Sequence, residues 1–191
     1  EYRIVNAADH GVPQRRKRLI LLAHARNGDV EFPAPKAEIV TVRQAIGDLP
    51  PAGKSGDLLH DTPEKRSKKV SKLITLVPKN GGSRSELPSR MRLKCHQKID
   101  GFKDIYGRMA WNDVAPTITS GCHNPSKGRF LHPVRNRAIT LREGAILQSF
   151  PDDFQFAPDG ARINFRGIGK LIGNAVPPPL AHVLGAALND L

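Results

Sequence analysis

The sequence predicts an α/β fold, and three features support this. Two apolar runs of strand length, at residues 2–5 and 19–23, flank a polar stretch containing Gly and Pro, which predicts strand, loop and strand. Short β-prone pieces separated by turns, at residues 115–121 and 128–133, predict a small irregular β region. After three prolines, an apolar stripe at intervals of three and four over residues 180–188 predicts a C-terminal helix that docks on a core.

Three further helices are expected between these features. A short helical pattern of apolar residues lies within residues 42–49. A second helix is predicted over residues 62–76, because a proline in the first helical turn costs no hydrogen bond. Thr140 and Glu143 form a capping-box pattern, which predicts a helix that starts there and stops before Pro151.

The composition favours a polyanionic partner. The chain has 191 residues, of which 39% are apolar, enough for a packed core. Thirty Lys and Arg against eighteen Asp and Glu give a net charge of +12, so nucleic acid is the expected ligand and a merely soluble basic protein the alternative. The basic run at residues 65–69 fits either a solvated helix face or a phosphate contact. The turn-rich loop at residues 78–84 carries cations and amides that suit phosphates.

The two cysteines do not predict a disulfide framework or a metal site. Cys95-His96 and Cys122-His123 lack the paired spacing of zinc ligands, and nothing nearby marks either sulfur as a nucleophile. No metal is therefore predicted. Since no uninterrupted apolar run is long enough for a membrane span, we expect no membrane association and a cytoplasmic location. The chain opens without Met, as though inside a strand, and we expect a fragment.

A cluster of polar and cationic residues, residues 14–18, stands at the entrance of the second predicted strand. Adjacent cations repel one another, so this cluster favours a site for an anion over a solvated turn. Alternation in an extended chain would place Arg16 and Arg18 on one face and Arg15 and Lys17 on the other. The glycine-rich stretch at residues 167–176 matches neither a P-loop nor a dinucleotide fingerprint, and we interpret it as a Gly–Asn turn at a helix start.

Three segments together resemble the closing motifs of DNA cytosine-5 methyltransferases, in the family's order: residues 6–18, residues 137–143 with 148–154, and residues 173–181. Residues 106–119 also resemble the conserved part of that family's target-recognition domain. The resemblance implies the final strands and last helix of a Rossmann-like S-adenosylmethionine-dependent methyltransferase domain, flanking a small irregular β-rich target-recognition domain. The implied divisions are catalytic-domain strands at 1–32, a target-recognition domain at 33–136, a motif helix and connection at 137–172, and a turn and returning helix at 173–191.

The resemblance also implies roles for individual residues. In this family a thiolate attacks C6 of a flipped cytosine and C5 takes a methyl group from S-adenosylmethionine. Arg16 and Arg18 are expected to stabilise the charge that develops on the ring, with Gln14 in support. The remaining roles are as follows: Gly173, Asn174 and Ala175 close part of the cofactor pocket; Arg137, Thr140 and Glu143 hold the recognition domain in register; and Thr117 and Thr119, with Lys79, Arg84, Arg108 and Arg129, contact double-stranded DNA.

The sequence departs from the family's pattern in the parts that carry the bond-forming chemistry. Neither cysteine follows a proline, as the family's nucleophile does, and there is no Glu-Asn-Val triplet or Phe-x-Gly-x-Gly loop. We therefore expect a C-terminal part of such an enzyme, as in restriction–modification, that is inactive without an N-terminal catalytic portion or a separate subunit. The alternatives are a stand-alone DNA-binding module and a degenerate partner that activates another methyltransferase.

Overall fold

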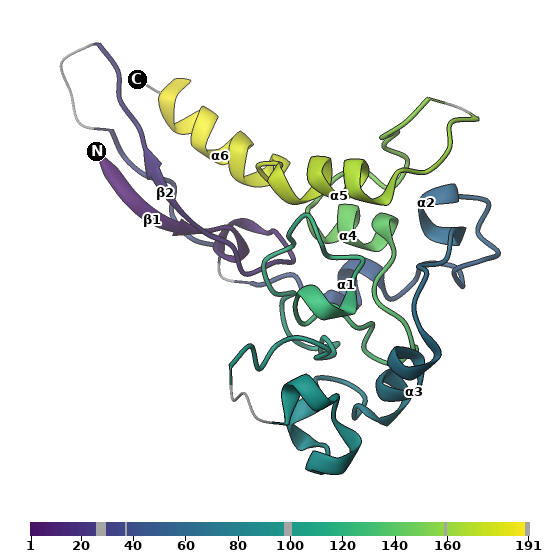
Figure 1. Cartoon of the computed structure of the whole chain (residues 1–191). Coiled ribbons are helices and arrows are strands. Elements are labelled where there is room, and N and C mark those ends of the chain that lie inside the picture. The colour runs from purple at the N-terminus through teal and green to yellow at the C-terminus, as the bar shows by residue number, and fades with distance from the viewer. Residues whose placement is uncertain (26–29, 37, 98–100, 159, 190–191) are drawn as a thin grey trace.

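The computed structural model describes residues 1–25, 30–36, 38–97, 101–158 and 160–189. The described elements are mixed α and β, as predicted (Figure 1). The strands and α-helices are β1 (Tyr2–Asn6), β2 (Lys17–Leu21), α1 (Val42–Ile46), α2 (Leu58–Asp61), α3 (Lys68–Leu76), α4 (Leu141–Leu147), α5 (Phe165–Asn174) and α6 (Pro178–Asn189). Short 3-10 helices cover Ala7–His10, Arg84–Glu86, Ser89–Met91, Lys94–His96 and Pro125–Lys127.

The two strands form an antiparallel hairpin, which confirms the predicted strand, loop and strand. Tyr2 lies opposite Leu21, and Asn6 lies opposite Lys17. The connection begins as a 3-10 turn that ends at Gly11, whose φ of 82° is in the left-handed region that glycine adopts without strain. The hairpin therefore brings the polar cluster at residues 14–18 to the base of β2.

Helix α6 covers one face of the hairpin and leaves the other open. Val5 and Leu22 share a hydrophobic cluster with Leu180 and Leu184, so the predicted docking of the C-terminal helix on a core is confirmed. Figure 1 shows the first and last segments of the chain meeting on one side of the molecule. On the opposite face, four apolar side chains are 68–72% exposed: Tyr2, Ile4, Leu19 and Leu21.

The middle of the chain has its own core. Helices α1, α4 and α5 pack around the buried Ala115 and Ile118, and a second cluster forms beneath α3. The capping box of Thr140 and Glu143 is present at the start of α4, as predicted, and α1 confirms the helical pattern at residues 42–49. The molecule thus has a closed middle and a half-covered hairpin.

The predicted helix over residues 62–76 is wrong in its first half. Thr62 is extended, with φ −76° and ψ 115°, because the ring of Pro63 disfavours the helical conformation of the residue before it. This ends α2, a helix that no sequence pattern predicted. Helix α3 starts only at Lys68, where the Ser67 side chain accepts a hydrogen bond from the backbone N–H of Val70.

The β-rich character expected of the middle region is also wrong. Within the described residues, the β-prone pieces make only isolated bridges, such as Arg108 with Leu131 and Leu131 with Ala138. Turns interrupt each extended stretch before a ladder can form, and short helices supply the packing. The region is irregular, as expected, but it is not a sheet.

Residues 167–174 lie inside α5, so Gly173 and Asn174 end one helix as well as standing just before the start of α6 at Pro178. The sequence did not predict α5, in which each glycine costs about 1 kcal/mol relative to alanine. Tertiary packing overrides that cost. A Cβ on Gly169 would lie 2.5 Å from the carbonyl oxygen of Ser120, and one on Gly173 would lie 2.2 Å from the nitrogen of Ser120. The glycines allow α5 to touch this backbone.

Helices α5 and α6 together include a stretch, Phe165–Leu188, that is long and apolar enough to cross a membrane by length and composition; its 18-residue window has a mean hydropathy of 1.3 and is 22% buried. The sequence pattern predicted no such stretch. Core helices of soluble proteins pass the same test, and one such stretch is weak evidence for a membrane. Ile168, Ile172, Leu180 and Leu184 from these helices are buried in the protein's own cores.

Candidate functional site

Gln14 joins three segments at a buried junction. Its side chain is fully buried and its Oε1 accepts a hydrogen bond from the backbone N–H of Ile118, at 2.7 Å. Its Nε2 donates to the carbonyl of Leu147, at 3.3 Å, and to Oε1 of Gln148. The backbone around Gln14 also bridges to Ala115. The amide therefore fixes the predicted DNA-facing segment against the end of α4.

Arg16 is also buried, and its hydrogen bonds link two segments. It is 5% exposed, and its guanidinium donates to the carbonyl of Ile118 and to the carbonyl of Gly173, both at 3.0 Å. Burial lowers the pKa of Arg16, and the nearby charge of Arg18 lowers it further. The side chain thus links the predicted DNA-facing segment to the turn predicted to border the cofactor.

Arg18, in contrast, is exposed at the start of β2. Its Nη1 donates to the carbonyl of Lys17, at 2.7 Å. Arg15 is exposed as well and pairs with Asp113 at 3.2 Å. Because Arg16 is occupied by the protein's carbonyls, Arg18 is the cation of the predicted catalytic pair that faces open space.

Buried side chains hold the backbone of the turn at residues 173–175, and the outer side of the turn is exposed. The carbonyl of Gly173 accepts from Arg16, and that of Ala175 accepts from Nε2 of Gln148 at 2.6 Å. Asn174 is exposed, and Val176 is 61% exposed. The turn therefore exposes one amide and one apolar side chain at neighbouring positions.

Gln148 also belongs to this junction, although it was not among the predicted site residues. It is fully buried at the end of α4, and it connects Gln14 to the carbonyl of Ala175. A signal was available, because a glutamine occupies a helical position where the apolar stripe predicts a core residue. A buried side-chain amide at such a position needs polar partners.

The two threonines of the predicted DNA-facing segment differ in their hydrogen bonding and exposure. The hydroxyl of Thr117 donates to the carbonyl of Arg15, at 2.8 Å. Thr119 is exposed, next to Ile118, which is fully buried. Hydrogen bonds with the side chains of Gln14, Arg16 and Thr117 fix the backbone of this segment, and the side chain of Thr119 is exposed at its end.

Arg108 is inside the protein, and a direct DNA contact by this residue is not compatible with its position. It is fully buried, and its five N–H groups meet five acceptors within the chain. Two of these are the carbonyls of Ile74 and Val77 at the C-terminal end of α3, where the helix dipole favours a cation. Burial lowers the pKa of Arg108. Its role is to join α3 to the turn at residues 132–136.

The other predicted DNA-binding cations also make contacts within the protein. Arg84 is 4% exposed and donates to the carbonyls of Gly101 and Phe102, both at 2.9 Å, so it is corrected to a residue that shapes a loop. Arg129 donates to the carbonyl of Gly81 at 2.8 Å and pairs with Asp104 at 3.1 Å. Lys79 is exposed, and its ammonium contacts Oδ1 of Asn136. Lys79 is therefore the most accessible of the four.

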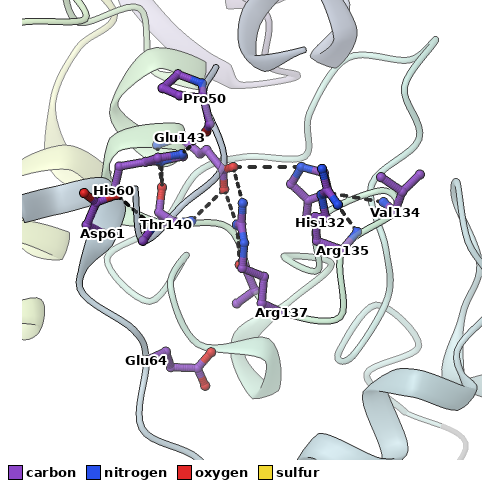
Figure 2. A network of polar contacts seen from close by, with 12 residues as sticks. Pro50, His60, Asp61, Glu64, His132, Val134, Arg135, Arg137, Thr140 and Glu143 are labelled. Atoms are coloured by element: carbon purple, nitrogen blue, oxygen red, sulfur yellow. Dashed lines mark hydrogen bonds and ion pairs between the residues drawn. The ribbon is translucent and has the colours of Figure 1, made fainter. Parts of the chain in front are cut away.

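The predicted structural triad forms one network at the start of α4. Arg137 makes two hydrogen bonds of 2.7 Å to the carboxylate of Glu143, which also accepts from the backbone N–H of Thr140 (Figure 2). Burial alone would raise the pKa of Glu143, but the Arg137 hydrogen bonds and charge outweigh it and lower the pKa. His60 binds the hydroxyl of Thr140 from the neighbouring segment, at 2.9 Å.

His132 borders the same carboxylate as a neutral ring. Its Nδ1 accepts from the backbone N–H groups of Val134 and Arg135, both at 3.1 Å, so its proton is on Nε2. Burial lowers the pKa of His132 to about 4, despite the opposing effect of Glu143. The Nε2 lies 3.9 Å from Glu143, which is too long for a hydrogen bond.

The described part of the chain contains no cluster of three His, Cys, Asp or Glu side chains able to hold a metal ion. Cys122 is fully buried, and burial raises its pKa to about 12. Its sulfur is therefore a thiol at neutral pH and not a nucleophile. Cys95 is exposed on a 3-10 helix.

Comparison with known proteins gives consistent matches. The family of C-5 cytosine-specific DNA methylases matches residues 1–190. The Type II methylase M.HgiDII of Herpetosiphon aurantiacus is 38% identical over 97% of this chain and 54% of its own length. The Type II methyltransferase M1.HphI of Haemophilus parahaemolyticus is 35% identical over 97% of this chain and 46% of its own length. The chain therefore spans about half the length of these curated relatives.

A solved structure shares the fold. It is a protein described as a DNA modification methyltransferase encoded within a prophage, from E. coli. It superposes with a TM-score of 0.53 at 23% sequence identity, and the match covers 100% of this chain and 61% of that one. At this identity the likeness concerns the fold alone.

Proposed function

Because this chain belongs to the family of C-5 cytosine-specific DNA methylases, we propose that it is the C-terminal, DNA-reading part of a DNA cytosine-5 methyltransferase. The reaction is transfer of a methyl group from S-adenosylmethionine to C5 of a cytosine flipped out of specific duplex DNA, as in restriction–modification. The observation that carries the proposal is the junction of Gln14 and Arg16, which joins the segments at residues 14–18, 115–119 and 173–175.

Within this proposal, Arg18 stabilises the charge on the reacting cytosine ring, and Arg16 holds Arg18 in position. Attack of a thiolate on C6 places negative charge on the cytosine, and an exposed cation beside the ring lowers the energy of that state. Arg16 is occupied by two carbonyls and holds the strand that presents Arg18. Thr119 and Lys79 are exposed, and we assign them to DNA contact. Gly173, Asn174 and Ala175 form one wall for S-adenosylmethionine, which supplies the methyl group when bound.

We assign the thiolate to a segment or subunit outside this chain. The buried thiol of Cys122 cannot serve, since its pKa is raised to about 12. The open apolar face of the hairpin, where Tyr2, Ile4, Leu19 and Leu21 are 68–72% exposed, supports this assignment. A two-stranded hairpin with one covered face is marginal by itself, and a further layer would bury this patch.

The test is reconstitution of methyl transfer. The chain is mixed with the N-terminal half of the Herpetosiphon relative or with its own upstream segment, and transfer of labelled methyl groups to duplex DNA is measured. Arg18→Ala should lower kcat by about 10²–10³-fold, which is the usual effect of removing one charge-stabilising group. Lys170→Ala, which removes an exposed cation of α5, should leave turnover nearly unchanged. Equal turnover of Arg18→Ala and the parent would exclude the role given to Arg18.

A stand-alone DNA-binding module is the second candidate, favoured by the net charge of +12 and by the closed core of the middle region. It predicts sequence-specific binding of duplex DNA by the chain alone, with affinity that falls steeply with salt. Specific binding together with no methyl transfer from any reconstituted mixture would favour this module. Loss of sequence preference without the N-terminal partner would favour the enzyme.

A further inference from the structure

A large cavity lies on the middle region, away from the junction of Gln14 and Arg16. It has a volume of about 630 Å³ and lies between residues 58–65, the turn at residues 123–124 and the segment before α5. A smaller cavity of about 230 Å³ shares the wall formed by Glu64, His123 and Phe165. None of the residues assigned above to catalysis, cofactor or DNA lines the larger cavity. It is therefore a separate candidate site.

The walls of the cavity suit a flat, unsaturated ligand. The rings of His123 and Phe165 lie 5.3 Å apart and are tilted by 53°. Burial lowers the pKa of His123, so its ring is neutral at pH 7 and presents an aromatic surface. Leu58, Pro63 and Ile163 add apolar surface. A volume of this size accommodates a small organic molecule of a few rings.

One carboxylate at the cavity provides a polar contact. Glu64 is 18% exposed at its side chain, and Arg66 contacts its Oε2 at 3.4 Å. A carboxylate that is largely withdrawn from water accepts hydrogen bonds well, and amino groups of nucleobases are donors of matching geometry. The neutral His123 adds a second polar group on the same wall. This arrangement favours a base that carries an exocyclic amine.

Two exposed cations stand at the rim of the cavity. Lys65 and Arg162 both line it and both are exposed. They lie on different segments, so a phosphate between them would be contacted from two sides. The combination of an aromatic wall, a largely shielded carboxylate and two cations at the rim matches the parts of a nucleotide. An apolar ligand would use the aromatic wall but would make no ionic contact with Lys65 or Arg162 at the rim.

The cavity and the predicted DNA-facing segment both adjoin α5. His123 follows Thr119 by four residues, and the ring of His123 and the carbonyl oxygen of Ser120 both lie close to Gly169 of α5. An unpaired nucleotide of DNA bound at Thr119 is therefore one candidate ligand for the cavity.

We propose that this cavity binds one nucleotide unit, with an amine-bearing base between His123, Phe165 and Glu64 and a phosphate at Lys65 and Arg162. The unit is either a free nucleotide or an unpaired nucleotide of bound DNA. The second source rests on the proposed DNA-binding function, and the first does not.

Fluorescence of 2-aminopurine tests the proposal with the chain as it is. The two probes are 2-aminopurine deoxyribonucleoside monophosphate and a duplex with a single unpaired 2-aminopurine. Stacking on Phe165 should quench at least one probe. Phe165→Leu should abolish the quenching, and Lys65→Ala with Arg162→Ala should weaken binding about tenfold or more. Lys170→Ala, on the exposed face of α5 and outside the cavity, is the matched control.

The outcomes separate clearly. Quenching of the free nucleotide assigns a free ligand, and quenching of the duplex probe alone assigns a nucleotide of DNA. Absence of quenching with both probes overturns the proposal, as does quenching that survives both Phe165→Leu and the double rim variant. Since Phe165 packs on the core, Phe165→Leu could destabilise the fold, and thermal unfolding of each variant checks for this. The rim variants change exposed side chains, so they test binding without disturbing the core. Methyl transfer that stays normal in a rim variant lacking quenching would leave the proposed function intact.

Discussion

The middle of the chain and its two ends bury their apolar residues very differently. In the middle, Ile74, Ile118, Leu147 and Ile172 are fully buried. At the ends, the inner face of the hairpin is covered by α6, but its outer apolar residues are 68–72% exposed. The middle region therefore has a closed core, whereas the hairpin is covered on one face only. If the proposed function holds, we expect the middle region to fold by itself and the open face of the hairpin to be covered when the proposed N-terminal portion associates.

The largest expected effect is on Arg108, the buried centre of the middle region. Arg108→Met removes the donor that binds four backbone carbonyls and the amide oxygen of Asn136, and we expect the free energy of unfolding to fall by about 3–5 kcal/mol. Urea unfolding followed by circular dichroism measures this. Arg90→Met, at an exposed position, is the control and should change stability by less than about 0.5 kcal/mol. A stable Arg108→Met protein with weakened DNA binding would restore the residue to the DNA-contact set.

Acidic pH should lower the stability of the middle region, because His132 is neutral in the folded state. The folded state keeps this ring neutral down to about pH 4, whereas the unfolded chain binds a proton near pH 6.5. The unfolded state thus holds more protons between these values, and the free energy of unfolding should fall by about 2–3 kcal/mol as pH drops from 6.5 to 4.

Chemical denaturation at several pH values measures this slope. His132→Gln should flatten it, and His182→Gln, at an exposed position on α6, should leave it unchanged. Identical slopes for the parent and His132→Gln would show that other groups control the acid sensitivity.

The contact of α5 with residues 119–120, inside the middle region, should be sensitive to a single methyl group. In Gly173→Ala the new Cβ would lie 2.2 Å from the nitrogen of Ser120, so the backbone must shift at a cost of about 1–3 kcal/mol. Gly185→Ala on α6 meets no atom within 4 Å and should stabilise the protein by about 0.5–1 kcal/mol. Thermal unfolding compares the two. Equal midpoints would indicate that α5 does not press on residues 119–120.

The smallest effect on the chain alone is expected at the open face of the hairpin. Leu19→Ser changes a side chain that is 68% exposed, so unfolding of the isolated chain should change by less than about 0.5 kcal/mol. Association with the N-terminal partner, measured by calorimetry, should weaken clearly. Leu180→Ala on the buried side is the contrast and should cost about 2–5 kcal/mol in the isolated chain. Unchanged association of Leu19→Ser would exclude this face as the docking surface.

Local patterns predicted the elements that local chemistry controls. The capping box at Thr140, the stripe of α6 and the hairpin follow from residues that are neighbours in sequence. Prediction failed where distant contacts compete with local preference. Helix α5 forms although Gly167, Gly169 and Gly173 weaken it, because close packing on Ser120 and burial of Ile172 compensate.

The candidate site shows the same limit. The cluster at residues 14–18 could be identified from its charge, and family resemblance supplied the roles. Which arginine is exposed could not be read from the alternation, because both Arg16 and Arg18 were expected on one face. Gln148 was seen only as a polar residue at a helical position, and the cavity beside Phe165 depends on three segments that no sequence pattern connects.

By itself, the sequence determined the family, the basic character and the helices whose caps and stripes are complete within a few residues. The tertiary structure decided which polar side chains are buried. Arg16 meets carbonyls 102 and 157 positions away, and Gln14 meets Gln148 across 134 positions. Burial is set by what packs against a side chain, and for these residues the partners lie far along the chain, so charge alone could mark them as special without showing whether they face a ligand or the core.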